Sequence, residues 1–246
     1  MNTVNCCPNK ALVESNERTS RIRSISGLCW PVGLAACLVI SGCASPRPMA
    51  YSGIASSSLL RPNAQDRSGR VPFSYATPVN WRQYYRVIID PVVVYRGADS
   101  QFGKIPEDGR RFLAGYMQQQ FTEKMKTVFE VVDKPAPGTL RLQLTLTGAK
   151  ATTPVIGTLS RFDLAGGSYN AVQSVRGKEG TLTGSVIYAV EIRDASTDRL
   201  LKAFITKQYP SPMNIKASFG AMGAAMTGIR KGADDLVEEL TAPSNR

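Results

Sequence analysis

Alternating apolar and polar residues mark the clearest strand of the chain, between residues 140 and 147. Successive side chains of a β-strand point to opposite faces, so a leucine at every second position places one face of this strand in a core. The alternation recurs in residues 182–192 and 201–205, on either side of the polar turn 194–198, and predicts a β-hairpin. The leucines of the first strand are Leu140, Leu142, Leu144 and Leu146.

Helical spacing of apolar residues predicts two longer elements. Residues 106–129 begin with Pro106, which suits a first helical turn, and with Glu107 and Asp108, whose charge the helix dipole favours there. Residues 229–240 form a second helix, with acidic residues opposite an apolar face. The two apolar stripes comprise Phe112, Leu113, Tyr116, Met117, Phe121, Met125, Val128 and Phe129, and Ile229, Ala233, Leu236, Val237 and Leu240. Such stripes are typical of helices that pack on a core.

Three further runs complete the predicted sheet. Residues 85–90 and 92–95 are rich in valine and isoleucine, and the short run 130–133 follows the first helix. This order of elements predicts an α+β fold, a mostly antiparallel sheet of about five strands with two helices packed on one face. We assign residues 81–242 to this single domain.

Three segments lack such a pattern. Residues 43–80 contain five prolines and are predicted to be a flexible tether, within which short apolar pieces are candidates for docking on the domain. Residues 151–178 form a long loop with aromatic and charged residues, the predicted contact for a partner. Residues 217–228 are rich in glycine, alanine and methionine, and their glycines weaken a helix, so this segment is predicted to be mobile or ordered by a partner. The apolar pieces are Tyr51, Ile54, Leu59-Leu60 and Val71-Pro72-Phe73.

The first 42 residues have the order of a lipoprotein signal peptide. Arginines precede an apolar run of 13 residues, Leu28 to Ile40, and the small residues Ser41 and Gly42 then lead to Cys43. This run is shorter than the roughly 20 apolar residues that a spanning helix needs. The end of the run resembles a lipobox, which implies lipid on the Cys43 sulfur and acylation of the freed amine. An ordinary cleaved signal and a retained transmembrane anchor are the alternatives.

Lipidation of Cys43 would place the chain in the bacterial envelope. The residue after Cys43 is Ala44 rather than the aspartate that marks inner-membrane retention, which favours the outer membrane, with the domain facing the periplasm. Every other cysteine precedes residue 43, so the mature chain would form no disulfide.

Composition narrows the classes of function. Without the leader the chain keeps 26 basic and 17 acidic residues, a net charge of +9, which suits contact with anionic envelope polymers and lipid head groups. No nucleic-acid-binding module or basic stripe is visible in the sequence. Histidine is absent from the whole sequence, which excludes Ser-His-Asp and Cys-His catalysis and disfavours zinc and other transition-metal sites.

No catalytic arrangement stands out among the remaining residues. The acidic pair Glu107-Asp108 is explained by a helix start, Asp194 and Asp198 by a turn, and the acidic residues of the last helix by a solvated face. A pair of glycosidase carboxylates flanking a cleft is the alternative that stays open. We therefore predict lipidation at Cys43 and no catalytic, cofactor-binding or metal site.

The chain from about Tyr51 to Leu240 resembles the DUF3313 family, bacterial lipoproteins with a domain of unknown function. The resemblance is carried by several pieces spread over the mature chain. They are Tyr51-Ser52-Gly53, Leu60-Arg61-Pro62, residues 85–92, 137–142 and 145–159, and Ile192-Arg193-Asp194. It implies a lipid-anchored envelope domain of unassigned activity, and it supplies no catalytic residues.

These observations favour a non-catalytic binding or scaffold module attached to the membrane by lipid on Cys43. The expected partner is an envelope protein or an anionic envelope polymer, contacted through residues 151–178 and 217–228, with no nucleic acid and no cofactor. An enzyme that acts on cell-wall glycan or lipid with carboxylates is the alternative, and a merely structural envelope component is a third. A deep cleft with two facing carboxylates would favour the enzyme, whereas exposed sheet edges and an apolar patch would favour binding.

Overall fold

The structure is a computed structural model that describes residues 46–152, 184–210 and 220–242. The described residues belong to one compact unit. The elements in chain order are β1 (Arg61–Pro62), β2 (Phe73–Ala76), the short 3-10 helix η1 (Trp81–Gln83), β3 (Arg86–Ile89), β4 (Val93–Val94), α1 (Glu107–Met125), β5 (Glu130–Val131), β6 (Thr139–Lys150), β7 (Ser185–Asp194), β8 (Leu200–Gln208) and α4 (Gly223–Thr241). No helix within the described ranges combines the length and the apolar character that crossing a membrane requires.

The sheet has eight strands and mixes parallel with antiparallel pairs, in the order β1-β2-β8-β7-β6-β3-β5, with β4 also paired to β6. The predicted mostly antiparallel sheet of about five strands is therefore wrong. The pairs β3–β5, β3–β6 and β4–β6 are parallel because the chain returns through α1 between these strands, and a helical crossover brings strands back in the same direction. The pairs on the other side of β6, including the predicted β7–β8 hairpin, are antiparallel.

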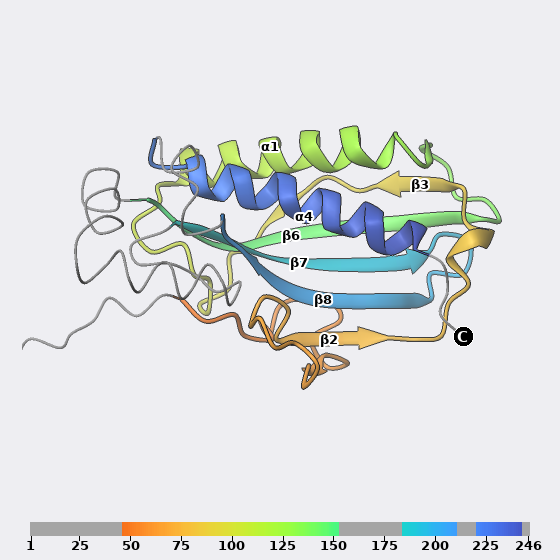
Figure 1. The fold of residues 1–246 in the computed structure, drawn as a ribbon, viewed down its shortest axis with the longest axis horizontal. Helices are drawn as coiled ribbons and strands as arrows, with labels where there is room; N and C mark the ends of the chain where they lie inside the picture. The colour runs from red at the N-terminus through yellow and green to blue at the C-terminus, as the bar shows by residue number, and fades with distance from the viewer. Residues whose placement is uncertain (1–45, 153–183, 211–219, 243–246) are drawn as a thin grey trace, which may run out of the picture. The chain divides into compact units, whose positions relative to one another are not determined.

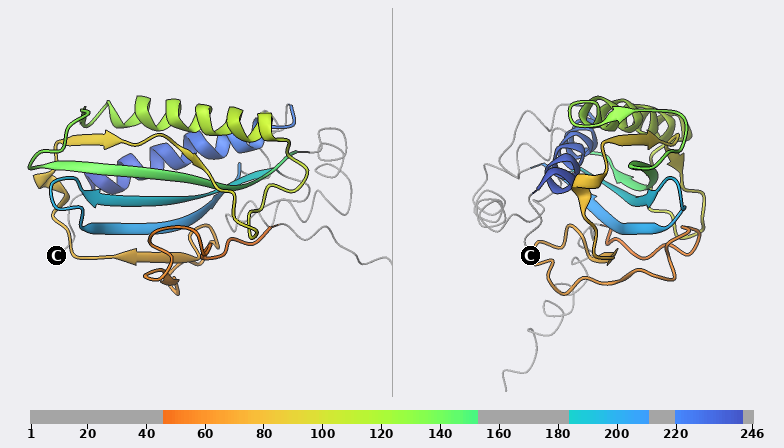
Figure 2. Two further views of the ribbon diagram at one scale, coloured as in Figure 1. Left: turned by 180° about the vertical axis from the view of Figure 1, so that it is seen from behind. Right: turned by 90° about the vertical axis from the view of Figure 1, so that its right-hand side faces the viewer.

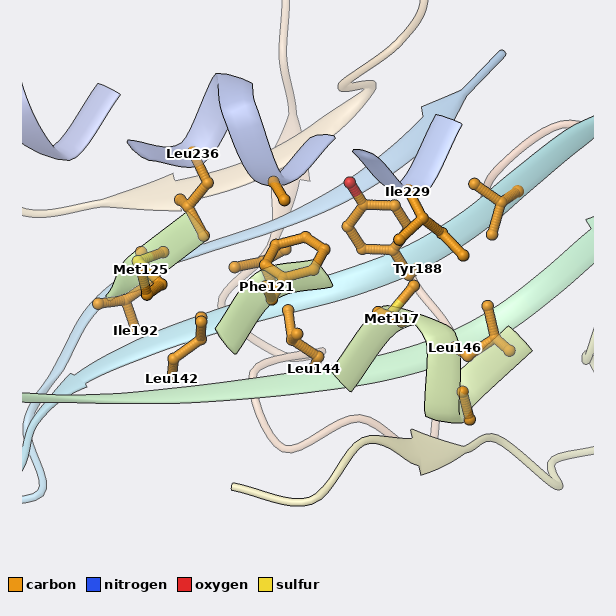
Figure 3. Close-up of a cluster of buried hydrophobic side chains, with 14 of the residues drawn as sticks. Met117, Phe121, Met125, Leu142, Leu144, Leu146, Tyr188, Ile192, Ile229 and Leu236 are labelled. Atoms are coloured by element: carbon orange, nitrogen blue, oxygen red, sulfur yellow. The ribbon is translucent and has the colours of Figure 1, made fainter. Parts of the chain in front are cut away.

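Both α1 and α4 lie against one face of the sheet (Figure 1). The alternating leucines of β6 face α1, and Tyr188 and Ile192 of β7 lie between the two helices and the sheet (Figure 3). The Phe121 and Tyr188 rings meet edge to face, with their centroids 5.9 Å apart. The main core is thus built from most of the predicted apolar stripes, and Leu144, Met117 and Phe121 are fully buried in it. Phe112 and Val128 of the first stripe are exposed instead.

The opposite face of the sheet carries a second core. Ile187, Ala189 and Ile205 project from β7 and β8 into a cluster with Tyr51, Ile54, Leu60 and Tyr95. The segment 46–60 supplies much of this cover, on the side of the sheet away from the helices (Figure 2). The central strands β6, β7 and β8 are therefore largely buried on both faces.

The described part of the predicted tether, residues 46–80, contributes strands rather than a free linker. β2 pairs with β8 along its whole length, and β1 pairs with β2. Tyr51, Ile54 and Leu60, three of the apolar residues named as docking candidates, are 2%, 6% and 5% exposed. The prolines of this segment are compatible with strand pairing, because β1 and β2 form one edge of the sheet, where a missing backbone N–H is tolerated.

The segment 217–228, predicted to be mobile or ordered by a partner, is helical from Gly223 onward. Its small residues are packed within the fold, with Ala224 and Ala225 each 1% exposed. Further along the helix, a β-carbon at Gly232 would overlap the hydroxyl group of Tyr188. The absence of side chains therefore lets α4 approach β7 closely, and packing against the sheet outweighs the low helix propensity of glycine.

Candidate functional site

The predicted functional segments lie largely outside the described residues. Cys43 precedes the first of them, Pro46, and the loop 151–178 is described only at Ala151 and Thr152. The segment 217–228 is described from Gly220 onward. The described residues at the ends of these segments therefore show where the segments join the fold.

These chain ends meet at one end of the sheet. A cavity of about 430 Å³, which we name the terminal cavity, lies where β6 ends and where α1 and α4 begin. Figure 1 shows the starts of both helices at the same end of the sheet. The cavity is lined by Pro46, the segment 101–106, Ala149, Lys150, Ala151, Ala221 and Met222. The Thr152 amide donates a hydrogen bond to the Ala221 carbonyl oxygen at 3.0 Å, which joins two of these chain ends directly.

The wall at Gln101 is held against β6 by backbone hydrogen bonds. The Gln101 amide donates to the Thr147 carbonyl at 2.9 Å, and the Ala149 amide donates to the Gln101 carbonyl at 3.1 Å. β6 has a bulge between Leu146 and Gly148, and a β-carbon at Gly148 would stand 2.8 Å from the Gln101 carbonyl oxygen. Glycine at the bulge therefore allows the close approach that shapes this wall.

The terminal cavity has an apolar floor and a basic rim. Phe102 and Ile105 are 2% and 4% exposed, and Ala149 and the partly buried Met222 lie beside them. The rim carries Lys104, which is exposed, and Lys150, which is half-buried. No acidic residue is found among the described residues that line the cavity. The arrangement suits an apolar group attached to an anionic one.

The chain that leads toward Cys43 is fastened beside this cavity. The Gln101 side chain accepts a hydrogen bond from the Tyr51 hydroxyl at 2.7 Å and donates one to the Arg47 carbonyl at 2.8 Å. The Lys207 ammonium donates to the Pro46 carbonyl at 2.8 Å. Burial raises the pKa of Tyr51 to about 12, so its phenol stays protonated and can donate near neutral pH.

A second polar cluster fixes the turn that follows Tyr51. The Tyr95 hydroxyl donates to an Asp99 carboxylate oxygen at 2.6 Å and accepts from the Gly53 amide at 3.1 Å. The hydrogen bond from Tyr95 lowers the pKa of Asp99. Tyr51 itself has a left-handed backbone, with φ of 39°, a conformation that a non-glycine residue keeps only when its surroundings hold it there. These hydrogen bonds hold the N-terminal segment in place on the folded domain.

A separate groove runs between β2 and the end of α4. It consists of two adjoining cavities of about 440 and 570 Å³, which share Ala76, Lys202 and Glu239. The Lys202 ammonium pairs with the Glu239 carboxylate, and burial lowers the pKa of Lys202. Asp66 also lines this groove.

The two carboxylates of the groove are occupied by structural contacts. Asp66 accepts hydrogen bonds from the Ser68 hydroxyl at 2.6 Å and from the Val71 amide at 2.5 Å, and so closes the β1–β2 turn. Glu239 is held by Lys202. A general acid must donate a proton to a substrate, whereas both of these carboxylates already accept contacts from neighbouring groups of the protein. Among the described residues, no group of three or more potential ligands is placed to hold a metal ion.

Comparison with known families settles what kind of chain this is. The model of a family described as a protein of unknown function, DUF3313, matches residues 50–236. The chain belongs to the DUF3313 family. The resemblance found in the sequence is confirmed, and the match extends from the buried Tyr51 region to the last turns of α4 of this DUF3313 protein.

Solved structures similar to the DUF3313 chain are distant. A PelC dodecamer from Paraburkholderia phytofirmans is 9% identical, with 69% of this chain and 97% of that chain covered and a TM-score of 0.35. The hypothetical protein CT253 from Chlamydia trachomatis is 9% identical, with 65% and 99% covered and a TM-score of 0.35. Protein XCC0632 from Xanthomonas campestris is also 9% identical, with 63% and 81% covered and a TM-score of 0.30. A comparison with curated proteins gives no match.

The residues that form the terminal cavity were not predicted as a site. Phe102, Ile105 and Met222 come from separate parts of the chain, and none belongs to a motif. The one signal in the sequence is the pair of apolar residues at 102 and 105 directly before Pro106, at a spacing that places both on the same side of a helical turn. The sequence did single out the segment that follows Cys43 and the segments 151–178 and 217–228, and their described ends meet at the terminal cavity.

Proposed function

We propose that this DUF3313 protein is a lipid-anchored, non-catalytic binding module of the bacterial envelope. Lipid on Cys43 attaches it to the outer membrane, and its domain faces the periplasm. The observation that supports this most strongly is the common position of three chain ends. Pro46, which follows Cys43 closely, and Ala151 and Ala221, which belong to the two predicted binding segments, line one cavity.

The anchor would keep this end of the domain close to the membrane. Only Ala44 and Ser45 separate Cys43 from Pro46, and the three residue steps of a fully extended chain span about 10 Å. Pro46 is held at the cavity by Lys207, and Arg47 by Gln101. The partner that binds at this end is an envelope protein or an anionic envelope polymer, in keeping with Lys104 and Lys150 at the cavity rim.

The carboxylate enzyme finds less support. The groove beside β2 brings Asp66 and Glu239 into one set of adjoining cavities, but the first closes a turn and the second pairs with Lys202. An enzyme of this kind needs one carboxyl group free to donate a proton. A binding role requires no such group.

Position-specific crosslinking in cells tests the binding role. A photoreactive amino acid replaces Lys104 at the cavity rim in one strain, and it replaces Asp133 in a matched control strain. Asp133 is exposed and lies near the start of β6, and the 12 residues of that strand span about 40 Å. We expect a crosslinked species of reduced gel mobility after illumination of the Lys104 strain and none from the Asp133 strain.

Two outcomes of this experiment would contradict the proposal. Equal crosslinking from Lys104 and Asp133 would show that the terminal cavity is not the contact. Absence of any crosslinked species from Lys104, with the protein correctly localised, would argue against a partner at this end.

A further inference from the structure

The chemistry of the terminal cavity points to a particular class of ligand. Its floor is formed by Phe102, Ile105, Ala149 and Met222, which offer no polar side-chain atom to a ligand except the weakly accepting methionine sulfur. A glycan or a polar peptide would lose its hydrogen bonds to water on such a floor without replacing them. An aliphatic chain loses nothing in that exchange and gains the removal of its surface from water.

The rim adds a requirement for negative charge. Lys104 and Lys150 both border the cavity, and the described residues that line it include no acidic side chain to neutralise them. A lysine ammonium acts as a point charge for phosphate groups. A ligand that fits floor and rim together therefore has an aliphatic chain ending in an anionic head group.

We propose that the terminal cavity binds one acyl chain of an anionic membrane phospholipid, with Lys104 and Lys150 beside the head group. The position of Pro46 at the cavity supports a membrane lipid as the occupant, because only two residues separate it from Cys43. The closeness of membrane lipid to the cavity rests on the proposed anchoring through Cys43. Binding of lipid in the cavity does not depend on the anchor, and it can be measured in solution.

The measurement uses the chain that begins at residue 43 and carries Cys43→Ser, so that no acyl chain of its own is present. The described residues belong to one compact unit, so this chain retains the whole fold. The probes are single-chain lysophosphatidylglycerol, which is anionic, and lysophosphatidylcholine of the same chain length, which has no net charge. Calorimetric titration below the concentration at which the lysolipids form micelles gives the dissociation constants.

We expect saturable binding of one lysophosphatidylglycerol per protein. Lengthening the acyl chain should tighten binding by about fourfold for each methylene that the cavity can bury, and further lengthening should have no effect. Ala221→Trp, at an exposed position that lines the cavity, should weaken binding by about tenfold or more because the indole occupies the space of the acyl chain.

Charge reversal separates the contribution of the rim from that of the floor. Lys104→Glu should weaken binding of the anionic probe by about tenfold and leave that of the zwitterionic probe nearly unchanged. Lys134→Glu is the matched control, because this residue is exposed and lies near the start of β6. It should alter neither constant.

Several results would overturn the proposal. These are the absence of saturable binding, an unchanged constant in Ala221→Trp, or equal affinity for the two lysolipids. Binding by the Cys43→Ser chain but not by the lipidated protein would show that the protein's own acyl chain fills the cavity, which also contradicts a membrane phospholipid as occupant. If crosslinking at Lys104 failed while lysolipid still bound, the result would contradict the proposed partner and support the lipid site.

Discussion

Gly232 shows how close packing can outweigh the low helix propensity of glycine in α4. Glycine lowers helix propensity by about 1 kcal/mol relative to alanine, so the glycines of residues 217–228 predicted a weak helix there, and Gly232 lies one turn further along the chain. In the structure Gly232 lies over the Tyr188 hydroxyl, and that ring is buried against Phe121 in the main core. Burial raises the pKa of Tyr188, so the phenol stays neutral within the core. The glycine sets the distance between α4 and the sheet.

Gly232→Ala tests this account, with Gly115→Ala as the matched control. Both positions are helical, but a β-carbon at Gly115 would meet nothing within 4 Å. We expect Gly232→Ala to lower the free energy of unfolding by about 1–2 kcal/mol, because overpacking outweighs the gain in helix propensity. Gly115→Ala should raise it by about 0.5–1 kcal/mol. Urea denaturation measures both, and a stabilising Gly232→Ala would contradict the close packing.

At the scale of elements, the sequence predicted strands and helices better than their partners. The strand β6 and the helix α1 could be predicted from their apolar residues, because each element is long and its pattern repeats. β4 and β5 contain two residues each, too few to show which neighbour they pair with. Their parallel pairing follows from the crossover through α1, whereas the sequence was read as a succession of antiparallel neighbours.

The N-terminal segment was misjudged for a different reason. Its prolines and small polar residues predicted a tether, and local pattern carries no information about contacts made across the molecule. Tyr51 bonds to Gln101, and the β2 strand pairs with β8. The terminal cavity was missed on similar grounds, because its floor combines residues from three parts of the chain.

Truncation shows whether this segment is part of the fold. A chain that begins at Pro46 should unfold cooperatively, because it keeps β1, β2 and the second core. A chain that begins at Pro78 loses Tyr51, Ile54 and Leu60, each worth about 1.5–3 kcal/mol of burial, from a total stability of only about 5–15 kcal/mol. We expect the shorter chain to aggregate or to melt at a far lower temperature in circular dichroism. Equal melting temperatures would contradict an integral role.

At the scale of the whole molecule, two sites of different character lie at different places on the sheet. At one end of β6 the chain ends converge on an apolar cavity with a basic rim. Along the β2 edge, a groove holds an ion pair and a turn-closing aspartate. The first arrangement suits a binding module whose anchor and ligand lie on the same side. The second stabilises the edge that the N-terminal segment adds to the sheet.

Attachment through Cys43 is the central claim, and labelling in cells with an alkyne analogue of palmitate tests it most directly. Wild-type protein, Cys43→Ser and the matched leader variant Cys37→Ser are compared after immunoprecipitation and fluorescent detection of the label. We predict that the wild type and Cys37→Ser incorporate the label, and that Cys43→Ser incorporates none. Undiminished labelling of Cys43→Ser would contradict the account.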